Sequence, residues 1–267
     1  MQAKMSKEFD KYAYYTWAVQ SPKYEAQFLR NTYRTHRKKL PKILREDFCG
    51  TFALCCEWVK LSPDHQAIGV DFDPEPLDYG RSNRLSKLKK AQASQISLHE
   101  QDVTKAKLPP ADLVCALNFS YFCLKQRKDM LRYFSRVYSS LRTDGVFILD
   151  CFGGSQCYEA NMEETYHEEK EFSYFWDQEN FNPIDQGAEF SIHFKRKREK
   201  RRNSVFHYDW RLWSPAELKD ILADAGFSQT LVYWEGTTRK GEGDGVFKPQ
   251  KIGEECEAWV AYLVALK

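Results

Sequence analysis

The apolar residues between positions 43 and 151 form short runs that alternate with helical patterns. Residues 43–73 have the outline of a strand, a tight loop, an apolar helix and a second strand. Residues 112–118 and 146–151 are almost continuously apolar, which is typical of parallel strands covered on both faces. Helical patterns at residues 74–90 and 126–141 separate the strands. This alternation predicts an α/β fold with a parallel sheet and right-handed crossovers.

The pattern changes after residue 154. From residue 172 to residue 213 apolar and polar positions alternate, as in antiparallel strands with one covered face. The segment therefore predicts a hairpin inserted between parallel units. Residues 227–234 and 258–266 predict two final strands, joined by a glycine-rich loop at residues 236–253. Because no helix lies between these two strands, we expect them to be antiparallel.

Composition narrows the class of protein. The 267 residues are 42% hydrophobic and 15% aromatic, and the net charge of +2 implies no general attraction to polyanions. The first ten residues are charged and no run approaches the ~20 apolar residues of a membrane span, so we expect a cytoplasmic protein without a membrane partner. Eight cysteines without a C-x-x-C pair predict reduced thiols and no metal site.

Glycine and acidic residues follow the predicted strands at positions that suit a nucleotide-like ligand. Gly50 lies in the loop after the first strand, where backbone can approach a ligand closely. Asp71 ends the next strand about 20 residues later, the spacing of a ribose-binding carboxylate. Phe72 could lie against an adenine ring. A short third strand is predicted at residues 96–98, and Asp102 with Val103 lies at its end. The carboxyl ends of these strands therefore predict an adenosine site.

These motifs resemble those of the class I S-adenosylmethionine-dependent methyltransferases, whose first loop commonly reads D-x-G-x-G-x-G and often contains C-G-T. The matching segments are Cys49-Gly50-Thr51, Gly69-Val70-Asp71, Gln101-Asp102-Val103, residues 141–145 and residues 218–227. The resemblance implies a Rossmann-like seven-stranded sheet, parallel except for its last strand. Helices would cover both faces, and the antiparallel insertion would follow the fifth strand. It also implies S-adenosylmethionine as cofactor and S-adenosylhomocysteine as product.

The resemblance divides the chain into four parts. Residues 1–40 would form N-terminal helices, whose aromatic cluster either packs on the domain or forms a lid. Residues 41–154 would bind the cofactor, and residues 214–267 would complete the α/β core. Residues 155–213 would form the insertion and cover the acceptor. Such an aromatic N-terminus and sheet-like insertion resemble the glycine and amino-sugar N-methyltransferases, which favours a small-molecule acceptor.

The first loop departs from the family pattern. Counting back from Cys49 places Glu46 at the acidic position, Phe48 at the first glycine and Phe52 at the third. Asp47 would take the acidic role if the loop were one residue out of register. Phenylalanine at two glycine positions would narrow the loop.

Four further residues are candidate cofactor contacts. Thr51 completes the C-G-T motif, and Asn118 ends the fourth strand, where the family contacts the methionine part of the cofactor. Arg45 either binds the methionine carboxylate or forms a salt bridge at the strand end. Tyr14 of the aromatic cluster is the last candidate.

No catalytic residue is fixed by the sequence. An amine acceptor needs only to be neutral, whereas a hydroxyl would need a base. The candidates are Tyr121, after the fourth strand, and His193, His207 and Asp209, on the polar face of the insertion. The methylated atom, the acceptor and the oligomeric state stay open.

Three other functions remain to be weighed. An RNA or protein methyltransferase would use the basic segment 195–202, although acidic residues just upstream favour a solvated hairpin tip. A nicotinamide-dependent enzyme would need G-x-G-x-x-G, which the loop lacks. A non-catalytic domain of the same fold would act as a partner or scaffold.

Overall fold

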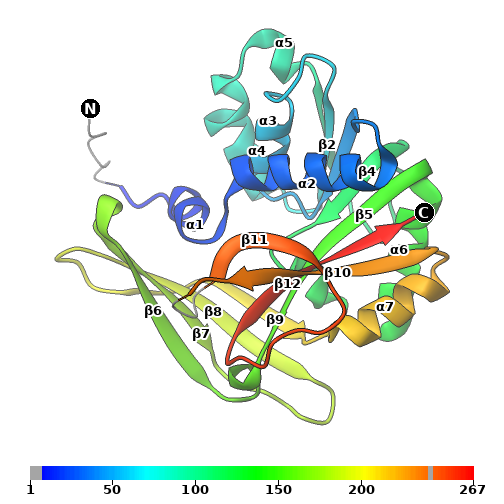
Figure 1. The fold of residues 1–267 in the computed structure, drawn as a ribbon. Helices are drawn as coiled ribbons and strands as arrows, with labels where there is room; N and C mark the ends of the chain where they lie inside the picture. Colours follow the sequence, from blue (N-terminus) through cyan, green and yellow to red (C-terminus); the bar gives the residue numbers. More distant parts are fainter. Residues whose placement is uncertain (1–7, 240–242) are drawn as a thin grey trace.

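The computed structural model describes residues 8–239 and 243–267, and within these residues the strands form two sheets (Figure 1). The large sheet has the order β11-β10-β12-β5-β4-β1-β2-β3. Its strands are β1 (Ile43–Asp47), β2 (Gln66–Asp71), β3 (Ile96–Glu100), β4 (Ala111–Ala116), β5 (Leu141–Gly153), β10 (Gln229–Thr237), β11 (Gly243–Gln250) and β12 (Trp259–Leu266). Strands β3, β2, β1, β4 and β5 pair in parallel, and β12 runs antiparallel to both β5 and β10.

The predicted α/β fold and its antiparallel last strand are confirmed, with one strand more than expected. The extra strand is β11, which pairs antiparallel with β10 inside the segment predicted as a loop. All its residues but Phe247 are exposed, so its sequence carries no alternation of apolar and polar positions. Phe247 alone packs inward, against Phe28 and Tyr262.

Helices cover both faces of the large sheet. They are α2 (Pro22–Arg37), α3 (Ala53–Trp58), α4 (Pro74–Asn83), α5 (Lys90–Ala93), α6 (Arg127–Ser140) and α7 (Pro215–Asp224). A further helix, α1 (Lys11–Val19), packs on the insertion. One core forms around α2 and α3, and another forms around α6 and α7. The helix predicted for residues 74–90 is shorter: α4 ends at Asn83 and a 3-10 turn follows. Serine and asparagine at its end are weak helix formers.

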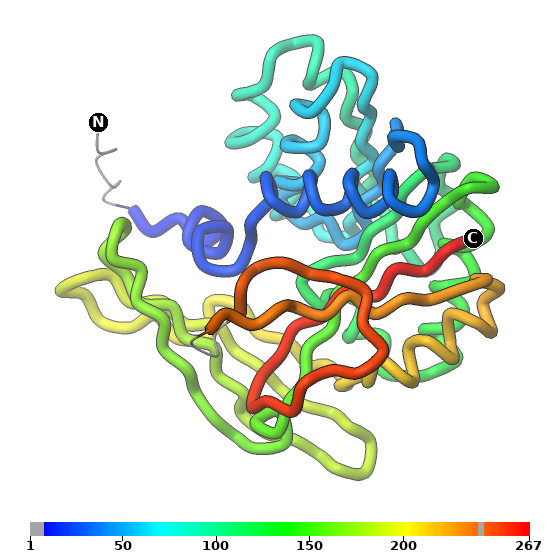
Figure 2. Tube along the Cα trace, in the orientation of Figure 1, coloured from blue at the N-terminus to red at the C-terminus, as the bar shows by residue number. Residues whose placement is uncertain are grey.

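The insertion is a four-stranded antiparallel sheet of order β6-β7-β8-β9, larger than the hairpin predicted. Its strands are β6 (Asn161–His167), β7 (Phe172–Gln178), β8 (Gly187–Arg196) and β9 (Arg202–Arg211). The prediction missed β6 because none of its residues is fully buried and five of seven are exposed. Helix α1 lies between this sheet and α4, as the tube in Figure 2 shows. Its Tyr14 packs on Phe172, and its Tyr12 packs on Tyr79 of α4.

Candidate active site

The loop after β1 has left-handed backbone at every second residue. Phe48, Gly50 and Phe52 have φ values of 58°, 51° and 44°. Side chains with a Cβ rarely adopt this conformation, which is why glycine is the usual residue there. These are the three positions at which the family resemblance places glycines. Phe48 and Phe52 therefore adopt the left-handed conformation expected of glycine, and their backbone is locally strained.

The Phe52 ring fits because residue 80 of α4 is glycine. Phe52 is fully buried, and a Cβ built on Gly80 would lie 2.3 Å from its Cε1 and 2.6 Å from the Thr51 carbonyl oxygen. Such distances are well inside van der Waals contact. Helix α4 can therefore lie this close to the loop only because residue 80 has no Cβ.

Asp71 joins the loop to the end of β2. Its Oδ2 accepts a hydrogen bond of 2.7 Å from the Gly50 N–H, and its Oδ1 accepts one of 3.0 Å from the Asp73 N–H. Burial raises the pKa of this carboxyl, and the backbone donors oppose the shift. Each oxygen keeps a lone pair for a further donor. Asp102 closes the turn after β3 by accepting from the Thr104 N–H and hydroxyl at 2.8 and 2.6 Å.

These strand ends border one hollow of about 320 Å³, here called the β2–β3 cavity. It is lined by Phe48, Asp71, Phe72, Gln101, Asp102, Val103, Thr104, Cys123 and Leu124. Four residues predicted to bind adenosine, Asp71, Phe72, Asp102 and Val103, thus lie around one space. Phe72 is 70% exposed, so its ring is available to a ligand.

The two acids of β1 point in opposite directions. Asp47 is buried and accepts from Arg45 Nε at 2.8 Å and from the Tyr133 hydroxyl at 2.9 Å. Glu46 accepts from the Cys55 N–H of α3 at 3.2 Å, and burial raises the pKa of Glu46 to about 8. Glu46 is therefore the acid that faces the loop and helix, as counted from Cys49.

Arg45 does not reach the cavity. Its side chain is 3% exposed, and its guanidinium donates to Asp47 and to the Ser140 hydroxyl. The strand-end salt bridge, which the sequence left as the alternative, is what the structure contains. Thr51 likewise faces helix α4, where its hydroxyl accepts from Arg84 Nε at 2.9 Å.

A second left-handed segment follows β4. Asn118 and Phe119 both have φ of 57°, and their N–H groups donate to the Asp150 carboxylate of β5 at 2.7 and 3.0 Å. Burial raises the pKa of Asp150 to about 7, although both N–H donors lower it. Asp150 was not among the residues predicted from the sequence. The signal was an acid inside the apolar run of residues 146–151.

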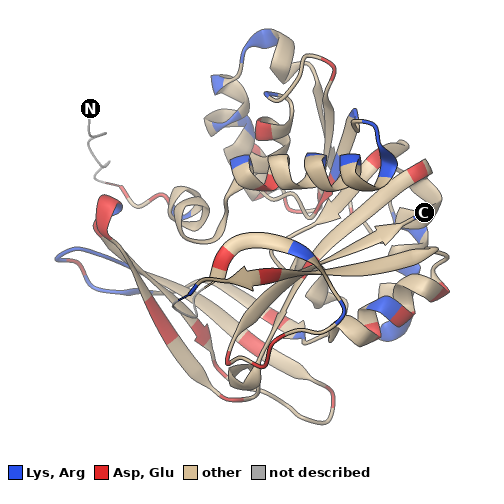
Figure 3. Cartoon of the chain, in the orientation of Figure 1, with Lys and Arg blue, Asp and Glu red and all other residues tan. Residues whose placement is uncertain are grey.

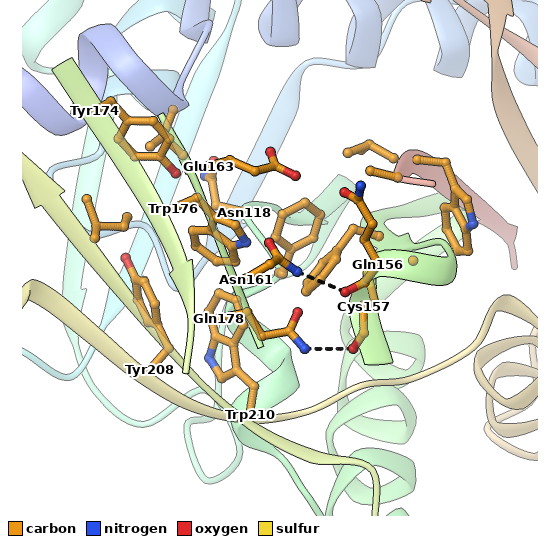
Figure 4. Close-up of a pocket in the computed structure, with 18 of the residues that line it drawn as sticks. Asn118, Gln156, Cys157, Asn161, Glu163, Tyr174, Trp176, Gln178, Tyr208 and Trp210 are labelled. Carbon is orange, nitrogen blue, oxygen red and sulfur yellow. Dashed lines mark hydrogen bonds between the residues drawn. The ribbon is translucent and has the colours of Figure 1, made fainter. Parts of the chain in front are cut away.

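Beyond Asn118 lies a larger hollow of about 340 Å³, the aromatic cavity (Figure 4). Its lining includes Tyr15 and Val19 of α1, Asn118 and Phe119, Phe152, Gln156 and Cys157, and Glu235 with Trp259 near the end of the chain. The insertion contributes Asn161, Glu163, Tyr174, Trp176, Gln178, Ile192, Tyr208 and Trp210. In the strand pairing Glu163 lies opposite Trp176, and Trp176 lies opposite Ile192. These insertion residues therefore share one face of the small sheet.

The predicted catalytic residues of the insertion lie on the other face of the small sheet, away from the aromatic cavity. His193 is buried between Asp177, at 3.0 Å from its Nε2, and the Ser204 N–H, at 2.8 Å from its Nδ1. His207 Nδ1 contacts the Ser191 hydroxyl at 3.2 Å, and Asp209 pairs with Lys125 at 2.6 Å. None of the three lines the aromatic cavity. The face of the small sheet that borders the hollow is the one that carries Tyr174, Trp176, Tyr208 and Trp210.

Tyr121 and Tyr14 line neither of the two cavities. Tyr121 is fully buried and its hydroxyl donates to the Asp150 carbonyl oxygen, so it supports the segment after β4. Tyr14 packs on the insertion, and the neighbouring Tyr15 lines the cavity instead. Burial raises the pKa of Tyr15 to about 12, and that of Tyr208 well above its ordinary value. Both cavity hydroxyls are therefore neutral at physiological pH.

The basic tip of the insertion is partly neutralised. Glu199 pairs with Arg196 and Arg202, and Glu171 pairs with Lys197. Figure 3 places the basic tip at the outer end of the β8–β9 hairpin. No group of three or more His, Cys, Asp or Glu side chains in the described residues could hold a metal. No helix in the described part of the chain is long and apolar enough to span a membrane.

Solved structures share this architecture. A S-adenosylmethionine-dependent methyltransferase from Clostridium acetobutylicum matches with a TM-score of 0.67 and 19% identity, over 96% of this chain and 98% of that one. CalS10 from Micromonospora echinaspora, an amino pentose methyltransferase, matches with a TM-score of 0.69 and 15% identity over 99% of both chains. The sugar N-methyltransferase KedS8 from a Streptoalloteichus species matches with a TM-score of 0.64 and 17% identity, over 99% and 97%.

No protein-family model and no curated protein sequence matches the chain. The structural matches nevertheless extend over almost the whole of each chain, insertion included. The chain has the fold of the S-adenosylmethionine-dependent methyltransferases.

Proposed function

We propose that the protein transfers a methyl group from S-adenosylmethionine to a small-molecule acceptor. The observation that carries this proposal is that two hollows meet the same short segment after β4. Cys123 and Leu124 border the β2–β3 cavity, whereas Asn118 and Phe119 border the aromatic cavity. A ligand with an adenosine at one end and a reactive methyl group at the other fits such an arrangement.

The residues of the β2–β3 cavity suit the adenosine. Asp71 would accept from the ribose hydroxyls with the lone pairs that its backbone donors leave free. The exposed Phe72 ring would stack on adenine, with Asp102 and Val103 at its edge. Gly50 would let the loop approach the cofactor, because nothing lies within 4 Å of the position a Cβ would take. Asn118 would contact the methionine part.

The acceptor would bind in the aromatic cavity. Methyl transfer is a displacement that needs the acceptor atom in line with the breaking bond between sulfur and carbon, so position and exclusion of water supply much of the rate. The rings of the insertion and the α1 residues Tyr15 and Val19 enclose the space from two sides. The tyrosine hydroxyls of the cavity are neutral, and the carboxylates in its lining are Glu163 and Glu235.

Formation of S-adenosylhomocysteine tests the proposal. The protein is incubated with S-adenosylmethionine and a pool of small amines, alcohols and carboxylic acids, and methylated products are identified by mass spectrometry. We expect S-adenosylhomocysteine to form only with both protein and acceptor present. A protein that binds neither cofactor nor product at millimolar concentration would contradict the proposal and favour the scaffold alternative.

An RNA acceptor is the second outcome to examine. It would require the basic tip, and binding would weaken steeply with salt. The ion pairs of Glu171 and Glu199 with the tip argue against this function.

A further inference from the structure

The aromatic cavity carries charge of one sign only. Two carboxylates, Glu163 and Glu235, belong to its lining, and no Lys, Arg or His is found among the described residues that line it. An acidic acceptor would find no partner there for its charge, and burying an unpaired anion is costly. The cavity therefore selects against carboxylates and phosphates.

The amide groups of the cavity also present acceptors. Gln178 Nε2 donates to the Cys157 carbonyl oxygen at 2.7 Å, and Asn161 Nδ2 donates to the Gln156 carbonyl oxygen at 3.0 Å (Figure 4). A carbonyl oxygen can only accept, so these contacts fix which end of each amide is the NH₂ group. The amide oxygens of Gln178 and Asn161 are left for a ligand. A ligand rich in N–H donors matches them.

Glu163 is the carboxylate that is free to bind. Glu235 already accepts from the Gly245 N–H at 2.8 Å, whereas no hydrogen bond or ion pair within the described chain engages Glu163. Glu163 lies opposite Trp176 in the sheet, and Figure 4 shows its carboxylate directed into the space beside Tyr174 and Trp176. A carboxylate beside aromatic rings is the arrangement that binds an organic cation.

We propose that the acceptor is an amine, bound as its cation between Glu163 and the rings of Tyr174 and Trp176. This inference rests on the proposed function and adds the chemical class of the acceptor. Before transfer the ammonium loses one proton to solvent. The nitrogen lone pair then forms the bond to the methyl carbon, the carbon–sulfur bond breaks with its electrons going to sulfur, and S-adenosylhomocysteine and the methylammonium product result.

A titration of protein saturated with S-adenosylhomocysteine tests this inference. Benzyltrimethylammonium, which cannot be methylated, is compared by calorimetry with the anion benzenesulfonate and with neutral benzyl alcohol. We expect the cation to bind at least tenfold more tightly than either. Glu163→Gln keeps the shape of the side chain and should weaken cation binding about tenfold.

Glu164→Gln is the matched control. Glu164 is the next residue of β6, exposed on the opposite face and paired with Phe175, so cation binding should be unchanged. Both variants should bind S-adenosylhomocysteine as the unmodified protein does. The inference is overturned if the cation binds no better than the anion, or if the two variants behave alike. If S-adenosylhomocysteine itself does not bind, the proposed function fails, and the cation titration without it then shows separately whether Glu163 binds an organic cation.

Discussion

The loop after β1 and the aromatic face of the insertion border neighbouring hollows, yet different forces shape them. The loop is set by backbone: three left-handed residues and the hydrogen bond from the Gly50 N–H to Asp71. The insertion face is set by side chains that alternate along four strands. A backbone site tolerates few substitutions, whereas a ring-lined surface can change its occupant by changing single side chains.

The comparison also explains the phenylalanines of the loop. Phe52 has the left-handed backbone that is usual for glycine, and its ring fits because Gly80 has no side chain in the space that the ring occupies. Glycine at position 80, outside the loop, thus makes room for a ring at a loop position where the resembling family has glycine.

Gly80→Ala should have the largest effect on stability. Its Cβ would lie 2.3 Å from a fully buried ring, and overpacking of a core costs about 1–3 kcal/mol. Denaturant unfolding measures the loss, and Gly187→Ala is the control, because there the nearest atom is the end of the Asp185 side chain. In a Phe52→Leu background the cost of Gly80→Ala should shrink. Equal costs in both backgrounds would show that Phe52 is not the cause.

Stability should fall as the pH rises from 5 to 8. Burial raises the pKa of Asp150 to about 7 and that of Glu46 to about 8, so the folded protein holds protons that the unfolded chain has lost. Each proton favours the folded state below the raised pKa and is lost as pH passes through it. Relative to the unmodified protein, Asp150→Asn should gain about 2 kcal/mol between pH 5 and 8. A difference that does not vary with pH would contradict the shifted pKa of Asp150.

Gly50→Ala should separate binding from stability. The added Cβ meets nothing within 4 Å, so only the left-handed backbone is strained, at a cost of about 1 kcal/mol. The same Cβ would stand where the loop approaches the cofactor, and we expect affinity for S-adenosylhomocysteine to fall at least tenfold. The folded fraction of Gly80→Ala should lose less affinity for S-adenosylhomocysteine than Gly50→Ala does. The reverse order would place the cofactor elsewhere.

The smallest expected effect is on the rate at which the Cys123 thiol is alkylated. Cys123 is surface-accessible at the wall of the β2–β3 cavity, where partial desolvation raises the pKa of its thiol to about 11, so maleimide should reach it but alkylate it slowly. Saturating S-adenosylhomocysteine should slow it further, by several-fold. Cys256 is exposed outside that cavity and should react at an unchanged rate. Protection of both thiols, or of neither, would contradict a ligand in this cavity.

The sequence predicted the parallel sheet because buried strands carry long apolar runs, and it predicted which residues gather in the β2–β3 cavity because strand ends meet at one edge. It did not predict β6 or β11, whose residues are mostly exposed and show no alternation. Their pairing depends on neighbouring strands rather than on their own composition. The pattern of apolar residues within β6 and β11 therefore does not identify them as strands.

The catalytic candidates of the insertion lie outside the aromatic cavity for a related reason. Polar residues at alternate positions indicated an active-site face, but the alternation shows only that two faces differ. Which face is covered depends on α1 and on the segment after β4, both distant in sequence from the insertion. Tyr15 and Trp176 line the aromatic cavity on the covered face, whereas His193 contacts Asp177 on the opposite face of the small sheet.

Calorimetry with S-adenosylhomocysteine, on the unmodified protein and on Asp71→Asn, tests whether the β2–β3 cavity binds the cofactor. Asp71→Asn keeps one oxygen but removes the charge that ribose hydroxyls would contact, while Asp73→Asn, at the start of α4, retains Asp71 and serves as control. We expect one site per chain in the unmodified protein, affinity reduced at least tenfold by Asp71→Asn, and little change with Asp73→Asn. Equal affinity in all three proteins, or no binding in any, would contradict this expectation.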